Sequence, residues 1–452
     1  MPVRAFALCS LAALTALPVP GRTAPAAPFA ESGGVMSAAH ASPQTRWWNV
    51  FADSGLDRLM TRLESDNTTI AVAAARLSAA RAHAALGRAQ TGPRLGLSVS
   101  GNYAAGPLIN AAGGSGALFT GALNGSWEPD LLGRLAPSRR ADKAEIRAAE
   151  ADGAAIRLLA EVHTARAWYA AIALGKARTH ALDVLELERE SQTIAQARFA
   201  RGLCSRQLVE DRAAEAARAE DRLSELTRLE IEARDALGYL VGDRTAIAPL
   251  TSHLPLPRPV PADLGAGLIE RRPDVAAAMA RAEAADARHS AARRDWLPQF
   301  RLTATGGTAS TDLSGLLAGG VGSFGLGLIA ALPGLDGGAH KARVARADAA
   351  RQLADVQLRD TLLVAYRETS DALAGIARAR STLANERSRG EIAQAEAERA
   401  KREAERGSLS RSALNDAKIV LLEANIASAL RQFNSIDADL TLLIALGGYW
   451  NT

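Results

Sequence analysis

The longest uncharged stretch of the chain, from Leu95 to Trp127, alternates between apolar and polar side chains. On its first arm, Leu95, Leu97, Val99 and Tyr103 share one face of an extended strand, and Arg94, Ser98, Ser100 and Asn102 share the other. After a glycine-rich break, Phe119, Leu123 and Trp127 share a face in the same way. Numerous glycines and Pro107 make the stretch a poor helix. The pattern predicts a transmembrane β-hairpin over 94–128, with a surface hairpin of a soluble domain as the alternative.

A second stretch of the same kind lies between Leu302 and Leu335, where Asp312 is the only charged residue. Phe300, Leu302 and Ala304 alternate with Arg301, Thr303 and Thr305, and the second arm aligns Phe324, Leu326, Leu328, Ala330 and Leu332 on one face. The alternation predicts a second hairpin over 299–333.

The two hairpins belong to an internal duplication with a period of about 205 residues. The matching positions are Pro93 and Pro298, Arg201-Gly202-x-x-Ser205 and Arg406-Gly407-x-x-Ser410, and Asp211 and Asp416. Each half therefore carries one hairpin between long helices. Four strands cannot close a barrel that spans a membrane, because its open edges would leave backbone groups unpaired in lipid. The sequence predicts a barrel that is shared between chains.

The pattern around the hairpins predicts the same plan in each repeat. The first repeat, 47–248, has a helix from Ser54 to about Gln90, the hairpin, and a long helix pair over 137–241. A Pro-rich connector, 249–261, precedes the second repeat, 262–452, with a helix that starts near Pro273 and a helix pair over 339–446. In the last helix an apolar seam steps by four and three residues through Leu422, Ile426, Ala429, Phe433, Ile436, Leu440 and Leu443, as in a left-handed coiled coil.

Composition agrees with thin packing between close helices, since only 4% of residues are aromatic and Ala and Gly dominate the apolar fraction. The net charge of +4 comes from interleaved acidic and basic residues, which is typical of solvated helix faces and not of a nucleic-acid surface. Residues 1–26 fit a secretory signal peptide with one basic residue, Arg4, and 27–46 fit an extended lead-in. The two cysteines, Cys9 and Cys204, give no disulfide framework once the signal is removed.

No motif in the sequence indicates catalysis. Gly320-x-Gly322-x-x-Gly325 fits a dinucleotide-binding pattern, but alternating residues and Pro333 follow it where that pattern requires a helix. The seven histidines are scattered without metal-ligand spacing. We expect no enzyme activity, no cofactor and no metal site.

Asp211 and Asp416 each lie nine residues after a turn glycine, near the tip of a returning helix. A solvated surface carboxylate is the commonest fate of such a residue. In an oligomer, however, one carboxylate per chain at a narrow end becomes a ring that attracts cations and can hold a constriction. Basic neighbours such as Arg411 and Lys418 are candidates to tie these carboxylates into pairs between chains.

Together these features resemble the outer membrane factors of the TolC and OprM type, in the efflux-associated branch called NodT-like. The resemblance rests on the order of Trp47-Trp48-Asn49-Val50-Phe51-Ala52-Asp53, Trp127-Glu128-Pro129-Asp130-Leu131-Leu132-Gly133-Arg134, Arg271-Arg272-Pro273-Asp274 and both Arg-Gly turns. It implies a mixed α/β membrane protein in which three chains form a 12-stranded transmembrane β-barrel, with four strands each, continued by a periplasmic α-helical coiled-coil barrel. It also implies that Asp416 matches the family's periplasmic gate aspartate, and we group Asp211 with it.

The resemblance further implies the partners and location. We expect a homotrimer in the outer membrane of a Gram-negative cell, in contact with outer membrane lipids. A periplasmic adaptor would dock on the helix tips, and an inner-membrane pump, expected to be of the resistance-nodulation-division type, would supply the energy. The tip residues expected to dock are Arg201, Gly202, Ser205, Arg406, Gly407 and Ser410.

Two departures from the family pattern qualify these expectations. Cys9 follows Phe6-Ala7-Leu8 very near the start, which argues against a lipid-bearing cysteine, and the second tip lacks the aromatic residue that Phe199 supplies in the first. The expected function is the passive exit duct of a tripartite efflux pump for small molecules. The alternatives are the exit duct of a type I protein secretion system and, from another class, a soluble periplasmic coiled-coil scaffold. The sequence does not identify the cargo.

Overall fold

The computed structural model describes residues 46–105, 115–242, 253–256, 271–319, 321–334 and 336–448. The predicted signal peptide, nearly all of the lead-in and most of the Pro-rich connector lie outside these ranges. The chain divides into two compact units, and each takes segments from both sequence repeats. We call them the strand unit, with described segments from 82–142 and 285–350, and the helical unit, with 45–81, 143–284 and 351–452.

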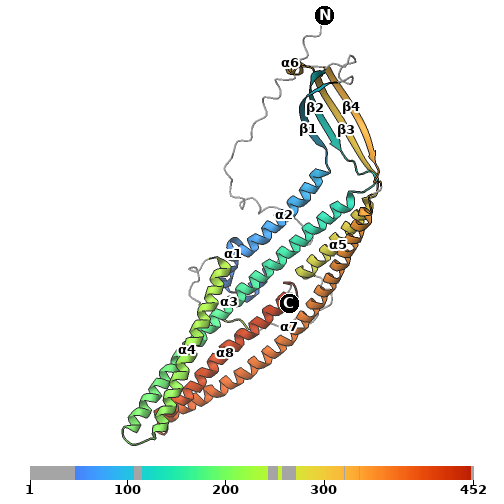
Figure 1. The fold of residues 1–452 in the computed structure, drawn as a ribbon. Helices are drawn as coiled ribbons and strands as arrows, with labels where there is room; N and C mark the ends of the chain where they lie inside the picture. The colour runs from blue at the N-terminus through green and yellow to red at the C-terminus, as the bar shows by residue number, and fades with distance from the viewer. Residues whose placement is uncertain are drawn as a thin grey trace. The chain divides into compact units, whose positions relative to one another are not determined.

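The strand unit contains one antiparallel sheet in the order β1-β2-β3-β4 (Figure 1). Its strands are β1 (Arg94–Ala105), β2 (Ser115–Trp127), β3 (Gln299–Ser310) and β4 (Val321–Ala331), and a short helix, α6 (Leu313–Leu317), follows β3. Pairing of β2 with β3 joins the two hairpins into this single sheet. The prediction of two hairpins at these positions is confirmed.

The duplication is visible in the strand registers. In the first hairpin Arg94 lies opposite Ser126, and in the second Gln299 lies opposite Ala331. Each residue of the second pair follows its counterpart by the same 205 positions that relate the two halves of the sequence. The repeat therefore extends to strand register, which turn geometry and the buried face together specify.

The helical unit is built mainly from two antiparallel helix pairs. Its described elements include a 3₁₀ helix, η2 (Trp47–Phe51), and the helices α1 (Ser54–Asp66), α2 (Thr68–Gln90), α3 (Ala136–Phe199), α4 (Arg206–Val241), α5 (Pro273–Arg294), α7 (Ala339–Glu405) and α8 (Arg411–Ala445), of which α2, α3, α5 and α7 are divided between the two units. The long helices agree with the predicted pairs over 137–241 and 339–446 within one or two residues. The predicted apolar seam of α8 is confirmed, since Ile426, Ile436 and Leu440 are fully buried.

Small side chains form much of the helical core, as the composition predicts. One cluster gathers Ala177, Ala181 and Val184 of α3 with Leu226 of α4 and Ile426 of α8. Alanines let neighbouring helix backbones approach closely and still reach the packing density of an interior. These helices are therefore stabilised by many close contacts along their length instead of by one thick core.

The first aromatic cluster packs inside the chain. Trp48 is buried, and the indole N–H of Trp47 donates to Glu161 Oε2 at 2.9 Å. Asp53 caps α1 by accepting from the backbone N–H of Gly55, and its second oxygen accepts from Trp168 Nε1 at 2.8 Å. These contacts anchor the start of the described chain on α3.

The helix predicted from Ser54 to Gln90 is interrupted, and this prediction was wrong at Asn67. The Asn67 side chain begins α2 by accepting from the backbone N–H of Ile70, and its Nδ2 donates to the carbonyl of Leu240 at 2.8 Å. An asparagine side chain competes with the helical backbone for hydrogen bonds, which favours a cap over a helix interior. The break therefore ties α1 and α2 to the end of α4.

Both helix tips end in the same turn. Gly202 and Gly407 adopt left-handed φ values of 72° and 74°. At the first tip the N–H of Leu203 bonds to the carbonyl of Arg198, and at the second Ser408 bonds to Glu403 in the same pattern. Ser205 and Ser410 then cap the returning helices. Glycine adopts this backbone conformation without steric cost, so each Arg-Gly pair stops a helix and reverses the chain.

We expect Asn67→Ala to destabilise the helical unit by about 1–2 kcal/mol, because it removes a helix cap and leaves the Leu240 carbonyl without its side-chain donor. Thermal unfolding of the detergent-solubilised protein, followed by circular dichroism, measures the effect. Ser65→Ala, at an exposed position of α1, is the matched control and should change stability by less than about 0.5 kcal/mol. Equal midpoints for the two variants would contradict this role of Asn67.

Candidate functional site

One face of the sheet is apolar and exposed. Leu95, Leu97 and Val99 of β1 are 72%, 70% and 66% exposed, and Phe324 and Leu326 of β4 are 91% and 85% exposed. The registers place Leu95, Gly125, Ala304 and Leu326 in one row across all four strands. A single chain thus exposes several large apolar side chains on one face of the sheet, which is typical of a surface that contacts lipid or another protein.

The opposite face of the sheet is polar and hydrogen-bonded across the strands. Ser100 and Thr120 share a hydrogen bond of 2.7 Å, and Asn124 Nδ2 donates to Ser98 Oγ at 2.9 Å. Thr303 donates to the carbonyl of Gly327 on the neighbouring strand. The sheet is therefore amphipathic, as in a barrel with lipid on one side and water on the other.

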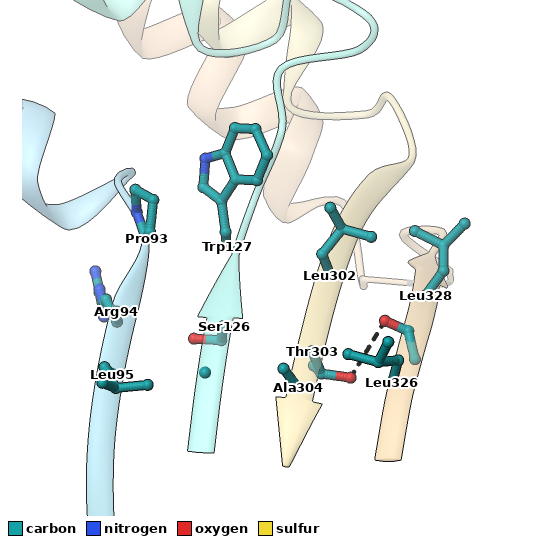
Figure 2. Close-up of a pocket in the computed structure, with 12 residues that line it drawn as sticks. Pro93, Arg94, Leu95, Ser126, Trp127, Leu302, Thr303, Ala304, Leu326 and Leu328 are labelled. Carbon is teal, nitrogen blue, oxygen red and sulfur yellow. Dashed lines mark hydrogen bonds between the residues drawn. The ribbon is translucent and has the colours of Figure 1, made fainter. Parts of the chain in front are cut away.

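A groove of about 660 Å³ lies at the end of the sheet where β1 begins, after Pro93, and where β2 ends, at Trp127. Figure 2 shows Trp127, Leu302 and Leu328 side by side on adjacent strands, with the smaller Ala304 beyond them. The groove exists because Gly125 and Ala304 are small between the larger Leu95 and Leu326. It belongs to the same exposed apolar face.

At the helix tips, Asp416 of α8 is bound by Arg212 of α4. The guanidinium donates from Nη1 and Nη2 to the two carboxylate oxygens at 2.7 and 2.9 Å. A paired fork of this kind fixes the orientation of both groups. Arg411, a predicted partner of the tip aspartates between chains, binds Glu190 of α3 at 2.8 Å within its own chain, and the pairing between chains stays a prediction.

A buried carboxyl lies beside this pair. Glu188 of α3 is 7% exposed, and its Oε2 lies 4.0 Å from Arg212 Nη1. Burial raises the pKa of the Glu188 carboxyl, while the charge of Arg212 opposes the rise and nearby acids add to it. Asn415, which is fully buried, donates to Glu190 Oε2 and to Ser191 Oγ. The tip thus holds two polar groups of side chains, one between α3, α4 and α8 around Arg212 and one between α3 and α8 around Glu190.

The other predicted site residues lie at the surface of the tips. Asp211 is exposed and accepts from Gln207 on its own helix, so it does not share the environment of Asp416. The six predicted docking residues, Arg201, Gly202, Ser205, Arg406, Gly407 and Ser410, are all exposed. Sequence reasoning missed Arg212, which has no counterpart in the second repeat because Ala417 occupies that position.

The described residues show no group of three or more His, Cys, Asp or Glu side chains that could hold a metal ion. In the same part of the chain, no helix combines the length and the apolar character needed to cross a bilayer.

An amphipathic sheet with exposed apolar residues and two long helix pairs define the class of an outer membrane channel subunit. A family model described as "Outer membrane efflux protein" matches residues 59–243 and 266–448. The chain belongs to this outer membrane efflux protein family, which is a family of channels and not of enzymes.

Individual relatives agree with this assignment. The outer membrane protein OprJ of Pseudomonas aeruginosa is 33% identical over 377 residues, which cover 77% of this chain and 75% of OprJ. The toluene efflux pump outer membrane protein TtgC of Pseudomonas putida is 28% identical over 471 residues, covering 100% of this chain and 95% of TtgC. The location of the chain is the outer membrane, and its role is that of an efflux pump's outer membrane channel.

The fold is also that of solved outer membrane proteins. The Campylobacter jejuni CmeC outer membrane channel matches with a TM-score of 0.80 at 21% identity, over 89% of this chain and 88% of CmeC. The outer membrane protein VceC of Vibrio cholerae matches with a TM-score of 0.76 at 25% identity, over 89% of this chain and 98% of VceC. The predicted fold class is confirmed.

We expect Glu188→Gln to stabilise the helical unit at pH 7.5. Because the folded-state pKa is raised, the neutral carboxyl contributes stability that is complete below the unfolded value near 4.5 and is lost as pH rises through the folded pKa. The amide keeps the shape and stays neutral, so the gain over the natural protein should disappear near pH 4. Thermal unfolding at both pH values tests this. A variant that is less stable at pH 7.5 would mean that attraction to Arg212 outweighs burial.

Proposed function

We propose that this outer membrane channel works as a homotrimer and forms the passive exit duct for small molecules delivered by a periplasmic adaptor and an inner-membrane pump of the resistance-nodulation-division type. The observation that carries the proposal is the open four-stranded sheet with its exposed apolar face. In lipid, the outer edges of β1 and β4 require partners for their backbone groups, and further copies of the chain supply them.

The duplication also predicts the strand register at which β4 of one copy pairs with β1 of the next. Within the chain, β2 pairs with β3 so that Gly125 lies opposite Ala304. The same pairing moved by one repeat sets Ala330 of β4 opposite Val99 of β1 in the next copy. Three copies then give twelve strands. Lipids cover the face that carries Leu95 and Leu326, and water fills the face that carries Ser100 and Asn124.

We infer that the periplasmic tips form the gate of the duct. Asp416, together with Asp211 at the matching position of the other helix pair, would face the axis of the proposed tube, and the six exposed tip residues would receive the adaptor. The fork from Arg212 neutralises Asp416 in each chain, which weakens the ring of negative charge that three bare aspartates would make. Gate opening then requires either movement of α8 away from α4 or a new partner for one of the two groups.

We propose that the inner-membrane pump, and not the duct, selects the cargo. Relatives carry names such as antibiotic efflux pump, toluene efflux pump and pyoverdine export outer membrane proteins. Diverse small molecules therefore fit ducts of this family, and we propose the same broad class here. A type I secretion duct remains the second candidate, and co-purification with an ABC exporter instead of the expected pump would favour it.

We expect the protein in the outer-membrane fraction as a trimer that dissociates on heating in detergent. In a Val99→Cys/Ala330→Cys variant with Cys204→Ser, oxidation should link the chains into covalent trimers, because these two positions pair across the barrel seam. Electrophoresis with and without heating and reductant measures both effects. Recovery as a water-soluble monomer would overturn the proposed function.

We expect opposite effects from the two members of the tip pair in planar-bilayer recordings. Asp416→Ala removes a carboxylate from the constriction, so it should raise single-channel conductance and weaken block by multivalent cations. Arg212→Ala uncovers the Asp416 charge and should strengthen cation block by about tenfold or less, given the usual worth of a partly exposed ion pair.

Arg218→Ala, at an exposed position two turns further along α4, is the control and should leave conductance and block unchanged. Trimers in which neither tip variant alters the block would show that the Arg212–Asp416 pair lies away from the conducting path.

A further inference from the structure

The helical unit contains a long antiparallel contact between α3 and α8 of the same chain. Asn415 Nδ2 donates to Ser191 Oγ at 3.3 Å, and Arg411 binds Glu190 near the tip. Far from the tip, Arg166 of α3 is ion-paired with Asp437 of α8. Apolar side chains of both helices fill the interval. We call this contact the in-chain seam.

The repeat assigns each α3 position of this seam to a position on α7, 205 residues later. Val162, Ala173, Val184 and Ser191 are buried, whereas their counterparts Arg367, Arg378, Arg389 and Glu396 are exposed. Other α3 positions keep their burial in both repeats, as Ala160, Ala167 and Ala171 match the buried Ala365, Ala372 and Ile376. Thus the compared α7 positions that correspond to the in-chain seam lack a cover within the described part of the chain.

The same shift relates α8 to α4 in the opposite direction. Asn415, Ile426, Ile436 and Leu440 of α8 are at most 1% exposed. Their counterparts on α4 are Glu210, Asp221, Ile231 and Asp235, which are all exposed, Ile231 by 54%. One chain therefore has two helix faces, on α7 and on α4, that correspond by the repeat to the two sides of the in-chain seam. At the compared positions neither face is covered within the described part of the chain, and we call them the two halves of a second seam.

The compared positions carry mostly opposite charges on the two exposed halves, with Glu396 of α7 as the exception. Three arginines, Arg367, Arg378 and Arg389, stand on the α7 half where α3 has Val, Ala and Val. Three acids, Glu210, Asp221 and Asp235, stand on the α4 half where α8 has Asn, Ile and Leu. Complementary potentials of this kind favour association of the two surfaces and fix its register.

We propose that the arginine face of α7 binds the acidic face of α4 from a neighbouring copy of this chain, in the arrangement that α3 and α8 take within one chain. The proposal rests on the trimer of the proposed function and names the helix faces that close it. Such a head-to-tail contact uses different surfaces on the two copies, and it closes into a ring when the rotation completes a circle.

The in-chain seam predicts the pairs of the second seam. Two helical turns from the Arg166–Asp437 contact along each helix lie Ala173 and Leu430. Their counterparts are Arg378 and Glu225, for which we expect an ion pair between copies, in addition to the pair that Glu225 makes with Arg228 of its own chain at 2.7 Å. Near the tip, the Asn415–Ser191 contact becomes Glu210 against Glu396, with Arg206, which binds Glu210 at 2.9 Å, beside both carboxylates.

Two pairs of counterparts are alike in charge, Glu210 against Glu396 near the tip and Asp371 against Glu232 further along. The Arg166–Asp437 contact becomes Asp371 against Glu232, and Arg228, which is ion-paired with Glu232 in its own chain, supplies a cation there. The two kinds of seam therefore differ physically. The in-chain seam is mostly apolar, whereas the seam between copies depends on ion pairs, which salt screens. We therefore expect the seam between copies to dissociate before the in-chain seam does.

Cross-linking tests the geometry. In a Cys204→Ser background, Glu210→Cys/Glu396→Cys should give covalent trimers with a short bismaleimide, because their counterparts Asn415 and Ser191 are in contact. The control Glu210→Cys/Glu398→Cys moves one thiol to another face of α7, whose counterpart Thr193 is exposed within the chain, and should not cross-link. Each single-cysteine variant should also remain uncross-linked.

Charge reversal tests the electrostatics. Arg378→Glu and Glu225→Arg should each speed dissociation of the trimer about tenfold at low salt, and the double variant should restore the rate. High salt should reduce the differences. Arg387→Glu, whose counterpart Leu182 is exposed in the chain, is the control and should dissociate at the natural rate.

The outcomes separate this inference from the proposed function. Trimers that form and pair at Val99 and Ala330, but cross-link through Glu398→Cys and not Glu396→Cys, would overturn the assigned helix faces and keep the duct. Charge reversals that change dissociation without mutual rescue would overturn the ion-pair seam. Absence of any trimer would instead overturn the proposed function.

Discussion

A sheet of four strands has two outer edges, and each unpaired N–H or C=O at such an edge costs several kcal/mol in lipid. Here the sheet presents Leu95, Leu97 and Leu326 to its surroundings, so its natural environment on that face is apolar. The chain can meet both requirements only when its edges pair with other copies. Strand number, strand order and the need for oligomerisation are thus one constraint, and the repeat satisfies it with two hairpins of identical register.

The helices meet a different solvent and are stabilised differently. Alanines at Ala177, Ala181 and Ala219 permit close helix packing, so stability is spread along the helix pairs and no single contact dominates. The Glu161 carboxyl, which is buried in this packing, is tied to Trp47 by a hydrogen bond. Burial raises the pKa of the Glu161 carboxyl, and the hydrogen bond from Trp47 partly offsets that rise.

Features with a period could be predicted from the sequence, and features that depend on one contact could not. Alternation located both hairpins, and four-three spacing located the seam of α8. The break at Asn67 was missed because its cause is the Leu240 carbonyl, 173 residues away in sequence. Arg212 was missed because the comparison of the two halves retains only what they share, and its counterpart is Ala417. The resemblance selected Asp416, but no pattern in the sequence pointed to its partner.

The divergence of the two halves has a physical reason. After a duplication, the face on α3 begins like the face on α7, and the face on α8 begins like the face on α4. The two pairs of faces differ in when they become buried. The first pair is buried as one chain folds, so apolar residues such as Ile426 and Leu440 stabilise it at once. The faces that we assign to neighbouring copies remain in water until another chain arrives, and an apolar stripe of that length would promote aggregation. Arginines and acids keep a single chain soluble and still complement each other on assembly. The apolar face of the sheet has no such freedom, because it must finally contact lipid. Charge differences between the repeats therefore lie on the helices and on the polar face of the sheet, where Arg301 matches Gly96.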